Sequence, residues 1–299
     1  MSKNKTNIAA SIRQRLLNQA RQQKRPFNEL LQYYAMERFL YRLSQSIHNE
    51  RFVLKGALML RVWQAPEARP TMDIDMLGRT ANQPDAIAAQ IAEITHTPVA
   101  DDGMEYDATQ LRTEVITEEA DYQGLRIRLE AKLSGARIPL QLDIGFGDAL
   151  VPDACLEHFP TLLDFPAPYL LCYSRESAIA EKFEAMVKLG GLNSRMKDFY
   201  DIWLLARRFD FNAAILGEAI HQTFLHRGTD RPSVLPFEGR FVVDKQSQWN
   251  AFHRRLDSPG VPENLAEVCS ALAEFLGVFL APGTISNYYW RAPGPWRHR

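Results

Sequence analysis

Residues 69–75 read Arg-Pro-Thr-Met-Asp-Ile-Asp and place two carboxylates two residues apart in a segment of β-strand character. A strand alternates its side chains between two faces, so Asp73 and Asp75 point one way while Met72, Ile74 and Met76 point into a core. Two carboxylates about 7 Å apart repel, and burying them requires a bridging cation or a proton. Oxygen ligands of this kind suit Mg²⁺ or Mn²⁺. Solvated edge strands also carry such pairs, so other segments of the sequence must distinguish a metal site from a solvated strand face.

The segment before this strand predicts a phosphate-binding turn. Residues 52–55 are a short apolar run of β character, Gly56 follows, and residues 57–63 have helical composition. A strand that ends in glycine and opens a helix presents free backbone N–H groups, which are suited to binding phosphate.

The order strand, glycine, helix and D-x-D strand resembles the nucleotidyltransferase superfamily of the DNA polymerase β type. That superfamily carries a third carboxylate on a later strand, and residues 141–148 supply Asp143 as the candidate. Leu142 and Ile144 share one face of that strand, and Asp143 lies on the other. The alternative for Asp143 is an ordinary solvated strand carboxylate.

Four further segments are similar to the AbiEii/AbiGii toxin family of nucleotidyltransferases. Residues 178–185 and 195–202 look like its third and fourth motifs, and residues 11–17 and 37–43 look like its lead-in. Many relatives have Gly-Ser or Gly-Gly at the phosphate-binding turn. Here Gly56-Ala57 follows Lys55, so phosphate would rely on backbone N–H groups alone.

The resemblance implies an α+β fold, with a mixed-sheet nucleotidyltransferase core, N-terminal helices and a C-terminal helical domain. It divides the chain into a basic helical lead-in (residues 1–50), the core (51–172), a helical domain that completes the nucleotide site (173–281) and a tail (282–299). The tail is basic and aromatic, and we expect it to be disordered or else to make an accessory contact.

The resemblance also implies roles for single residues. Asp73 and Asp75 would hold the metal ion at the NTP phosphates, while Asp143 would help a second ion or act as base. Lys182 would stabilise phosphate charge, unless it snorkels along the edge of its helix. The expected catalytic residues are Asp73, Asp75, Asp143, Lys182 and Asp198, and the expected nucleotide-binding residues are Lys55, Gly56, Arg69, Thr71, Lys182, Arg195 and Asp201.

Several of these side chains have a second interpretation. Arg69 either neutralises an NTP phosphate or pairs with the first aspartate of the D-x-D sequence. Thr71 has the strand parity of the site face, but a plain β-branched strand residue explains it too. Arg195 and Asp198 either line a nucleotide pocket or support their helix as an i, i+3 pair. Asp201 is an equal candidate for the functional carboxylate of this motif.

Helix and strand periodicity predicts the rest of the core. We expect a helix from about residue 8 to residue 24 and a second helix from Pro26. Residues 98–110 are expected to form a loop, before strands at 114–117, 125–133 and 138–144 with Gly135 in a hairpin. The apolar stripe of the second helix is Met36, Phe39, Leu40, Leu43 and Ile47.

Charge and cysteine content narrow the partners and the compartment. The formal net charge is −1, yet residues 1–51 hold ten Lys or Arg against three Glu, a net of +7. That segment would contact RNA phosphates or an acidic protein, or pack on the chain itself. Three widely spaced cysteines predict reduced thiols in a cytoplasm. No apolar stretch reaches the length of a membrane span, and no signal peptide is expected.

The resemblance therefore implies a metal-dependent nucleotidyltransferase that uses NTP, with Mg²⁺ or Mn²⁺ as cofactor. It would be the toxin of a toxin–antitoxin or phage-defence pair, restrained by a cognate antitoxin, with a tRNA end or a protein as acceptor. One alternative is a small-molecule nucleotidyltransferase of the antibiotic-modifying type, which needs an acidic acceptor pocket. The other is a non-catalytic NTP-binding interaction protein.

Overall fold

The structure is a computed structural model that describes residues 7–65, 69–118, 122–256, 258, 260–280 and 287–298. The chain divides into two compact units. The first comprises residues 1–64, 70–147 and 155–172, and the second comprises residues 65–69, 148–154 and 173–299.

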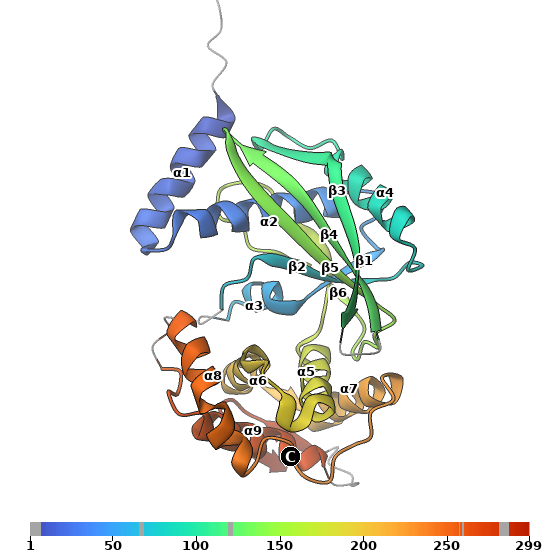
Figure 1. Ribbon diagram of the computed structural model, residues 1–299, viewed down its shortest axis with the longest axis vertical. Helices are drawn as coiled ribbons and strands as arrows, with labels where there is room; N and C mark the ends of the chain where they lie inside the picture. Colours follow the sequence, from blue (N-terminus) through green and yellow to red (C-terminus); the bar gives the residue numbers. More distant parts are fainter. Residues whose placement is uncertain are drawn as a thin grey trace, which may run out of the picture. The chain divides into compact units, whose positions relative to one another are not determined.

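The first unit is built on a mixed sheet of seven strands in the order β3-β4-β5-β2-β1-β7-β6 (Figure 1). The strands are β1 (Phe52–Lys55), β2 (Asp73–Gly78), β3 (Met104–Glu118), β4 (Tyr122–Leu133), β5 (Ala136–Phe146), β6 (Cys155–His158) and β7 (Tyr169–Cys172). Strand β2 is parallel to β5 and antiparallel to β1. This arrangement places β2 and β5 side by side in the middle of the sheet.

Strands β3, β4 and β5 form an antiparallel meander. Ser134 and Gly135 join β4 to β5 with φ of 48° and 79°, the left-handed values that suit a two-residue hairpin. The hairpin at Gly135 was expected. The predicted loop over residues 98–110 is confirmed for residues 98–103 and was wrong for residues 104–110. Strand β3 begins at Met104, because its backbone pairs with the far end of the long β4 and its Met104 side chain is buried.

Helices cover the apolar face of this sheet. The unit contains α1 (Ile8–Gln23), α2 (Phe27–Gln45), η1 (Gly56–Leu58), α3 (Met59–Val62) and α4 (Pro84–Thr95). Helix α2 contacts β5, β7 and α4, and α4 contacts β3, so α2 and α4 lie on the same face (Figure 1). Ile74 and Met76 of β2 and Leu142 and Ile144 of β5 are fully buried.

Two residues expected in the core lie outside it. Met72 is 55% exposed, because β2 begins only at Asp73 and the strand alternation does not yet apply. Ile47 is 82% exposed, because α2 ends at Gln45, before the apolar stripe reaches it.

Part of the basic N-terminal segment packs inside the first unit. Arg42 donates two hydrogen bonds of 2.6 and 2.9 Å to the buried carboxylate of Asp102. The buried Arg38 lies 3.0 Å from Glu37. These arginines are internal ion-pair partners, so the net charge of this segment overstates what it offers to a polyanion.

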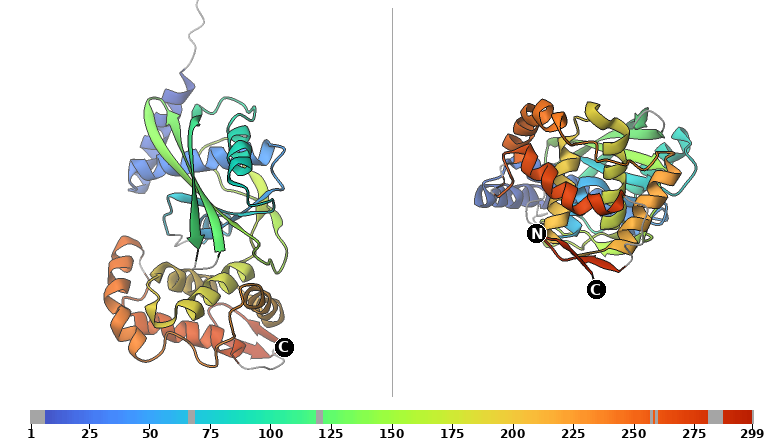
Figure 2. Two further views of the ribbon diagram at one scale, coloured as in Figure 1. Left: turned by 45° about the vertical axis from the view of Figure 1, so that its right-hand side comes forward. Right: turned by 90° about the horizontal axis from the view of Figure 1, so that it is seen from below.

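The second unit combines helices with a small sheet (Figure 2). Its helices are α5 (Arg175–Leu189), η2 (Gly190–Leu192), α6 (Met196–Arg208), α7 (Ala213–His226), α8 (Arg240–Leu256), α9 (Leu265–Leu276) and η3 (Gly277–Phe279). Its sheet has the order β10-β9-β8, with β8 (Phe211–Asn212), β9 (Tyr288–Trp290) and β10 (Trp296–His298). Among the described helices of the whole chain, none combines the length and the apolarity that a bilayer span requires.

The expectation of a disordered tail was wrong for residues 287–298, which are folded. Trp290 is 2% exposed and its indole N–H donates to the carbonyl of Ala206 at 2.6 Å. The Trp296 ring stacks on Phe275, with 5.6 Å between the ring centroids, and its N–H donates to the Phe275 carbonyl. Two anchored indoles stabilise this strand pair although arginines flank them.

Candidate active site

Neighbouring strands bring three carboxylates together on one face of the seven-stranded sheet. In the parallel register of β2 and β5, Asp75 is paired with Asp143 and Asp73 with Gln141. One ligand oxygen from each of Asp73, Asp75 and Asp143 lies within 4.8 Å of the others. Ligands about 2.1 Å from a Mg²⁺ ion are at most about 4.2 Å apart, so a small side-chain movement would let all three bind one ion. The described side chains therefore fit a hard divalent cation.

These carboxylates belong to a row of charged residues that crosses five strands. The row runs Glu114 (β3), Arg126 (β4), Asp143 (β5), Asp75 (β2) and Lys55 (β1), each the cross-strand partner of the next. Residues in register on adjacent strands share a face, so the sheet alternates negative and positive groups around the adjacent Asp143 and Asp75. A cation bound between the adjacent carboxylates of Asp143 and Asp75 would be stabilised more strongly than elsewhere along this row.

Arg126 neutralises the third carboxylate. Its Nε and Nη2 atoms donate to the two oxygens of Asp143 at 2.8 and 2.7 Å, a bidentate pair. The hydrogen bonds to Asp143 raise the pKa of Arg126 against the effect of desolvation. Gln141 also donates to Asp143, at 3.3 Å. Asp143 is thus held in place by its neighbours in the sheet.

Gly56 lets the backbone approach Asp75 closely. Its φ is +71°, and a Cβ atom added there would lie 1.9 Å from Oδ2 of Asp75. A side chain at this position is excluded both by conformation and by space. Gly56 opens the 3₁₀ turn η1, which continues into the short helix α3 as the sequence predicted. Lys55, the residue before it, is 7% exposed.

Helix α2 fixes the start of β2. The amide of Gln32 donates to the carbonyls of Met72 at 3.1 Å and Pro139 at 2.9 Å, which ties β2 to β5. The Tyr33 hydroxyl accepts from the N–H of Thr71 at 3.1 Å. The Thr71 hydroxyl in turn donates to Oδ1 of Asp73, so Thr71 does face the carboxylates, although it lies before the start of β2.

The second unit holds a separate cluster of predicted site residues. Lys182 on α5 lies 2.9 Å from Oδ1 of Asp198 and 2.8 Å from Oδ2 of Asp201, both on α6. Arg69 donates to both oxygens of Asp201, at 2.8 and 3.0 Å. Arg195 lies 2.6 Å from Asp198. Three cations therefore surround two carboxylates whose side chains are at most 2% exposed.

The protonation states in this cluster follow from its charges. Burial alone would raise the pKa of Asp201, but Arg69 and Lys182 outweigh it and lower the pKa to about 2. Burial is likewise outweighed at Asp198, where Lys182 and Arg195 lower the pKa. Burial would lower the pKa of Lys182, but the two aspartates raise it. Lys182, Asp198 and Asp201 therefore stay ionised near neutral pH.

Comparison of the sequence with protein-family models identifies the family of this chain. Residues 38–274 match the family model described as "Nucleotidyl transferase AbiEii toxin, Type IV TA system". The chain belongs to the AbiEii family. It is therefore a nucleotidyl transfer enzyme of a toxin–antitoxin system, as its sequence motifs implied. The AbiEii match includes both groups of charged side chains and ends before β9 and β10.

Other comparisons are more distant. A candidate nucleotidyltransferase from H. pylori has a TM-score of 0.40 to this AbiEii protein at 14% identity, with 86% of this chain and 85% of that chain covered. JHP933 from Helicobacter pylori gives a TM-score of 0.42 at 15% identity, with 82% and 98% covered. No curated protein matches the sequence.

The predicted residues fall into two groups in the AbiEii fold. The first unit holds Asp73, Asp75, Asp143, Lys55, Gly56 and Thr71. The second unit holds Arg69, Lys182, Arg195, Asp198 and Asp201. Arg69 pairs with Asp201, a partner that its sequence neighbourhood did not indicate. Sequence reasoning also missed Arg126 and Gln32. Arg126 shares the strand parity of Arg128 on the polar face of β4, but only the register shows that it meets Asp143.

Proposed function

We propose that this AbiEii-family enzyme transfers a nucleotide from an NTP to the end of an acceptor RNA such as a tRNA, with Mg²⁺ or Mn²⁺ as cofactor. The observation that carries the proposal is the gathering of Asp73, Asp75 and Asp143 oxygens within 4.8 Å on adjacent strands. Oxygen-only donor sets of this size are typical ligands of such ions. When bound, the ion would supply Lewis-acid stabilisation of phosphate charge.

Each carboxylate has a distinct environment for this task. Asp75 rests against Gly56, so the turn backbone and the carboxylate approach the same small space. Asp73 accepts from Thr71, which orients it. Asp143 is oriented by Arg126 and Gln141, and we assign it to ligand binding or to accepting the proton of the attacking hydroxyl. The backbone N–H groups after Lys55 and Gly56 are proposed to contact the triphosphate.

For the cluster in the second unit we propose a phosphate contact by its cations. The Lys182 ammonium has three donors, and the carboxylates of Asp198 and Asp201 take two of them. The Arg195 side chain is 36% exposed. In this role Asp198 and Asp201 position the cations and do not themselves react.

The biological setting follows the family. The type IV toxin–antitoxin assignment implies an antitoxin partner, and we propose growth control or phage defence as the role. None of the three cysteines, Cys155, Cys172 and Cys269, forms a disulfide bond, which favours a reducing compartment such as the cytoplasm.

Incubation with each of the four labelled NTPs, total RNA and Mg²⁺ tests the proposal directly. We expect label in a discrete RNA band with one preferred NTP, and no label with an Asp75→Asn variant. Asp85→Asn, an exposed aspartate on α4, is the matched control and should retain transfer. Label in a protein band would instead make a protein the acceptor. NTP binding without any labelled product would contradict nucleotidyl transfer.

A further inference from the structure

The strand pair near the end of the chain, β9 and β10, has one buried and one open face. In register, Trp290 of β9 is paired with Trp296 of β10 and with Phe211 of β8. These rings pack with Phe275, so that face belongs to the core of the second unit. Alternation then requires Tyr289 and its partners to lie on the other face.

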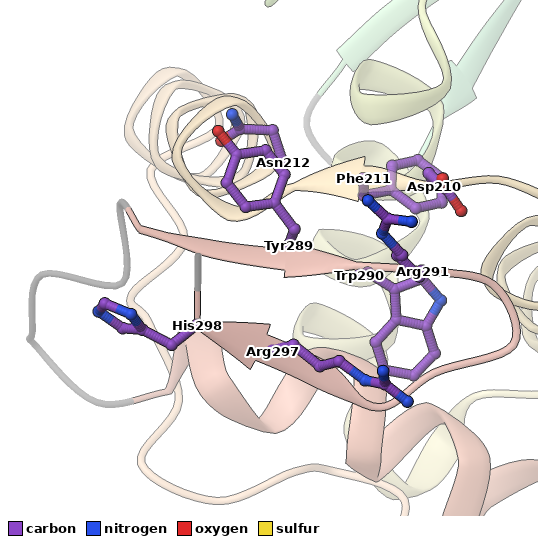
Figure 3. A pocket seen from close by; sticks show the side chains of 8 residues that line it. All are labelled: Asp210, Phe211, Asn212, Tyr289, Trp290, Arg291, Arg297 and His298. Carbon is purple, nitrogen blue, oxygen red and sulfur yellow. The ribbon is translucent and has the colours of Figure 1, made fainter.

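The open face carries a row of polar and aromatic side chains. Asn212 on β8 is paired with Tyr289 on β9, which is paired with Arg297 on β10 (Figure 3). Arg291 follows two residues after Tyr289 and also lines the pocket (Figure 3). The row lines a cavity of about 540 Å³, within the range of about 300–1,000 Å³ that small-ligand sites occupy. The complete lining is Asp210, Phe211, Asn212, Tyr289, Trp290, Arg291, Arg297 and His298.

The charge of this pocket is open to a ligand. Arg291 and Arg297 are exposed, and among the described residues neither has a carboxylate within 4.0 Å. The one carboxylate of the pocket, Asp210, accepts the backbone N–H of Ala292 at 2.9 Å. Two guanidinium groups on a fixed strand pair therefore face solvent without the internal partners that Arg38 and Arg42 have in the first unit.

The combination of groups favours a nucleotide over other anions. An acidic peptide would satisfy the two arginines but would use neither the Tyr289 ring nor the Asn212 amide. A nucleotide has a base that stacks on an aromatic ring, base edges that pair with an amide, and a phosphate for guanidinium groups. Single-stranded RNA is read in this way on sheet surfaces, with aromatic side chains under the bases.

We propose that this pocket, named here the C-terminal pocket, binds an unpaired nucleotide of the acceptor RNA. The base stacks on Tyr289, and Arg291 and Arg297 bind the adjoining phosphates. The Asn212 oxygen caps α7 by accepting from the N–H groups of Ala214 and Ile215, so its NH₂ group donates to the base edge. The inference rests on the proposed function in taking RNA as the acceptor. It goes beyond the family assignment, because β9 and β10 lie after residue 274, where the AbiEii match ends.

Fluorescence anisotropy with a 5′-labelled oligouridylate of 12 nucleotides, without NTP, tests the C-terminal pocket. The double variant Arg291→Gln/Arg297→Gln should weaken binding about 25-fold at 0.1 M salt. It should also make the slope of log affinity against log salt concentration shallower by about 1.4, which corresponds to the loss of two phosphate contacts. Tyr289→Leu should weaken binding about 5- to 150-fold, the range for one stacked base. Circular dichroism and thermal melting should show that both variants fold.

Arg254→Gln/Arg255→Gln on the exposed end of α8 is the matched control, with the same charge change in the same unit. It should change affinity by less than about twofold. Equal losses of oligouridylate affinity in the two double variants would show that only the net charge of the protein matters, and would overturn the proposal. Unchanged affinity of Tyr289→Leu, together with displacement of the RNA by polyglutamate, would overturn it in favour of an acidic protein partner.

A parallel transfer assay separates this inference from the proposed function. If the wild-type enzyme labels RNA and the pocket variants label it with an unchanged KM for RNA, the inference about the C-terminal pocket fails and the proposed function stands. If the variants lose oligouridylate binding while wild type transfers no nucleotide to RNA, the pocket stands and the proposed function fails.

Discussion

In the proposed metal site, Arg126 and the ion would compete for Asp143, and this competition has a measurable size. The guanidinium donates to both oxygens of Asp143 at 2.8 and 2.7 Å, and the two side chains are 29% and 8% exposed. Hydrogen bonds between charged groups contribute about 1.5–3 kcal/mol net. An ion that takes Asp143 as its third ligand must offset this energy. Arg126→Gln should therefore tighten Mg²⁺ binding about 10- to 150-fold, at about 1.4 kcal/mol per tenfold.

Isothermal titration with Mg²⁺, and with Mn²⁺ as a second probe, measures this change without any turnover. Arg128→Gln is the matched control, because Arg128 lies two residues along the same strand, pairs with Glu114 and carries the same charge. Arg128→Gln should alter affinity only through long-range charge. Equal affinity gains in the two variants, or no gain for Arg126→Gln, would refute the reasoning and remove Asp143 from the ligand set.

The other predictions concern single side chains. Asp75→Asn should abolish transfer in the labelled-NTP assay while the melting temperature stays equal or rises, because one of two adjacent anions is lost. Gly56→Ala should cost about 2 kcal/mol or more in urea unfolding, from its φ of +71° and the overlap with Asp75. Lys182→Met should lower the free energy of unfolding by about 3–5 kcal/mol, since two buried carboxylates lose a partner, while the exposed Lys197→Met should be near neutral; similar urea midpoints would contradict this. Asp201 has a pKa of about 2 against an ordinary 3.8, so on acidification the unfolded chain takes up this proton before the folded chain does. Roughly 2 kcal/mol of the free energy of unfolding that is present above pH 4 is therefore lost as the pH falls to 2. Asp201→Asn should flatten the plot of unfolding free energy against pH in that range.

Local sequence patterns were sufficient for the parts of the fold that depend on local chemistry. Ile87, Ile91 and Ile94 are spaced four and three residues apart, which is the spacing of one helix face, and all three side chains are fully buried in α4. Serine is a common helix N-cap, and the hydroxyl of Ser174, which precedes α5, accepts from the N–H of Ser177. The D-x-D spacing predicted that Asp73 and Asp75 share a face, and the sheet places them there.

Long-range pairing explains what the sequence did not reveal. No local pattern states that β5 inserts between β4 and β2, so the contact of Arg126 with Asp143 depends on register alone. The tail was misjudged for a related reason. Its arginines and prolines are typical of a disordered end, but Trp290 and Trp296 find partners on elements that lie far away in the chain.

The parallel pairing of β2 with β5 also sets the order of events during synthesis. Asp75 and Asp143 are 68 residues apart, and β3 and β4 must be made between them. At about 5–20 residues per second, the ribosome needs roughly 3–14 s to add that stretch. A nascent chain or a truncated product that stops before β5 carries the D-x-D strand without its third carboxylate. The three carboxylates can therefore meet on the sheet only seconds after the D-x-D strand has been made, once β5 has been added.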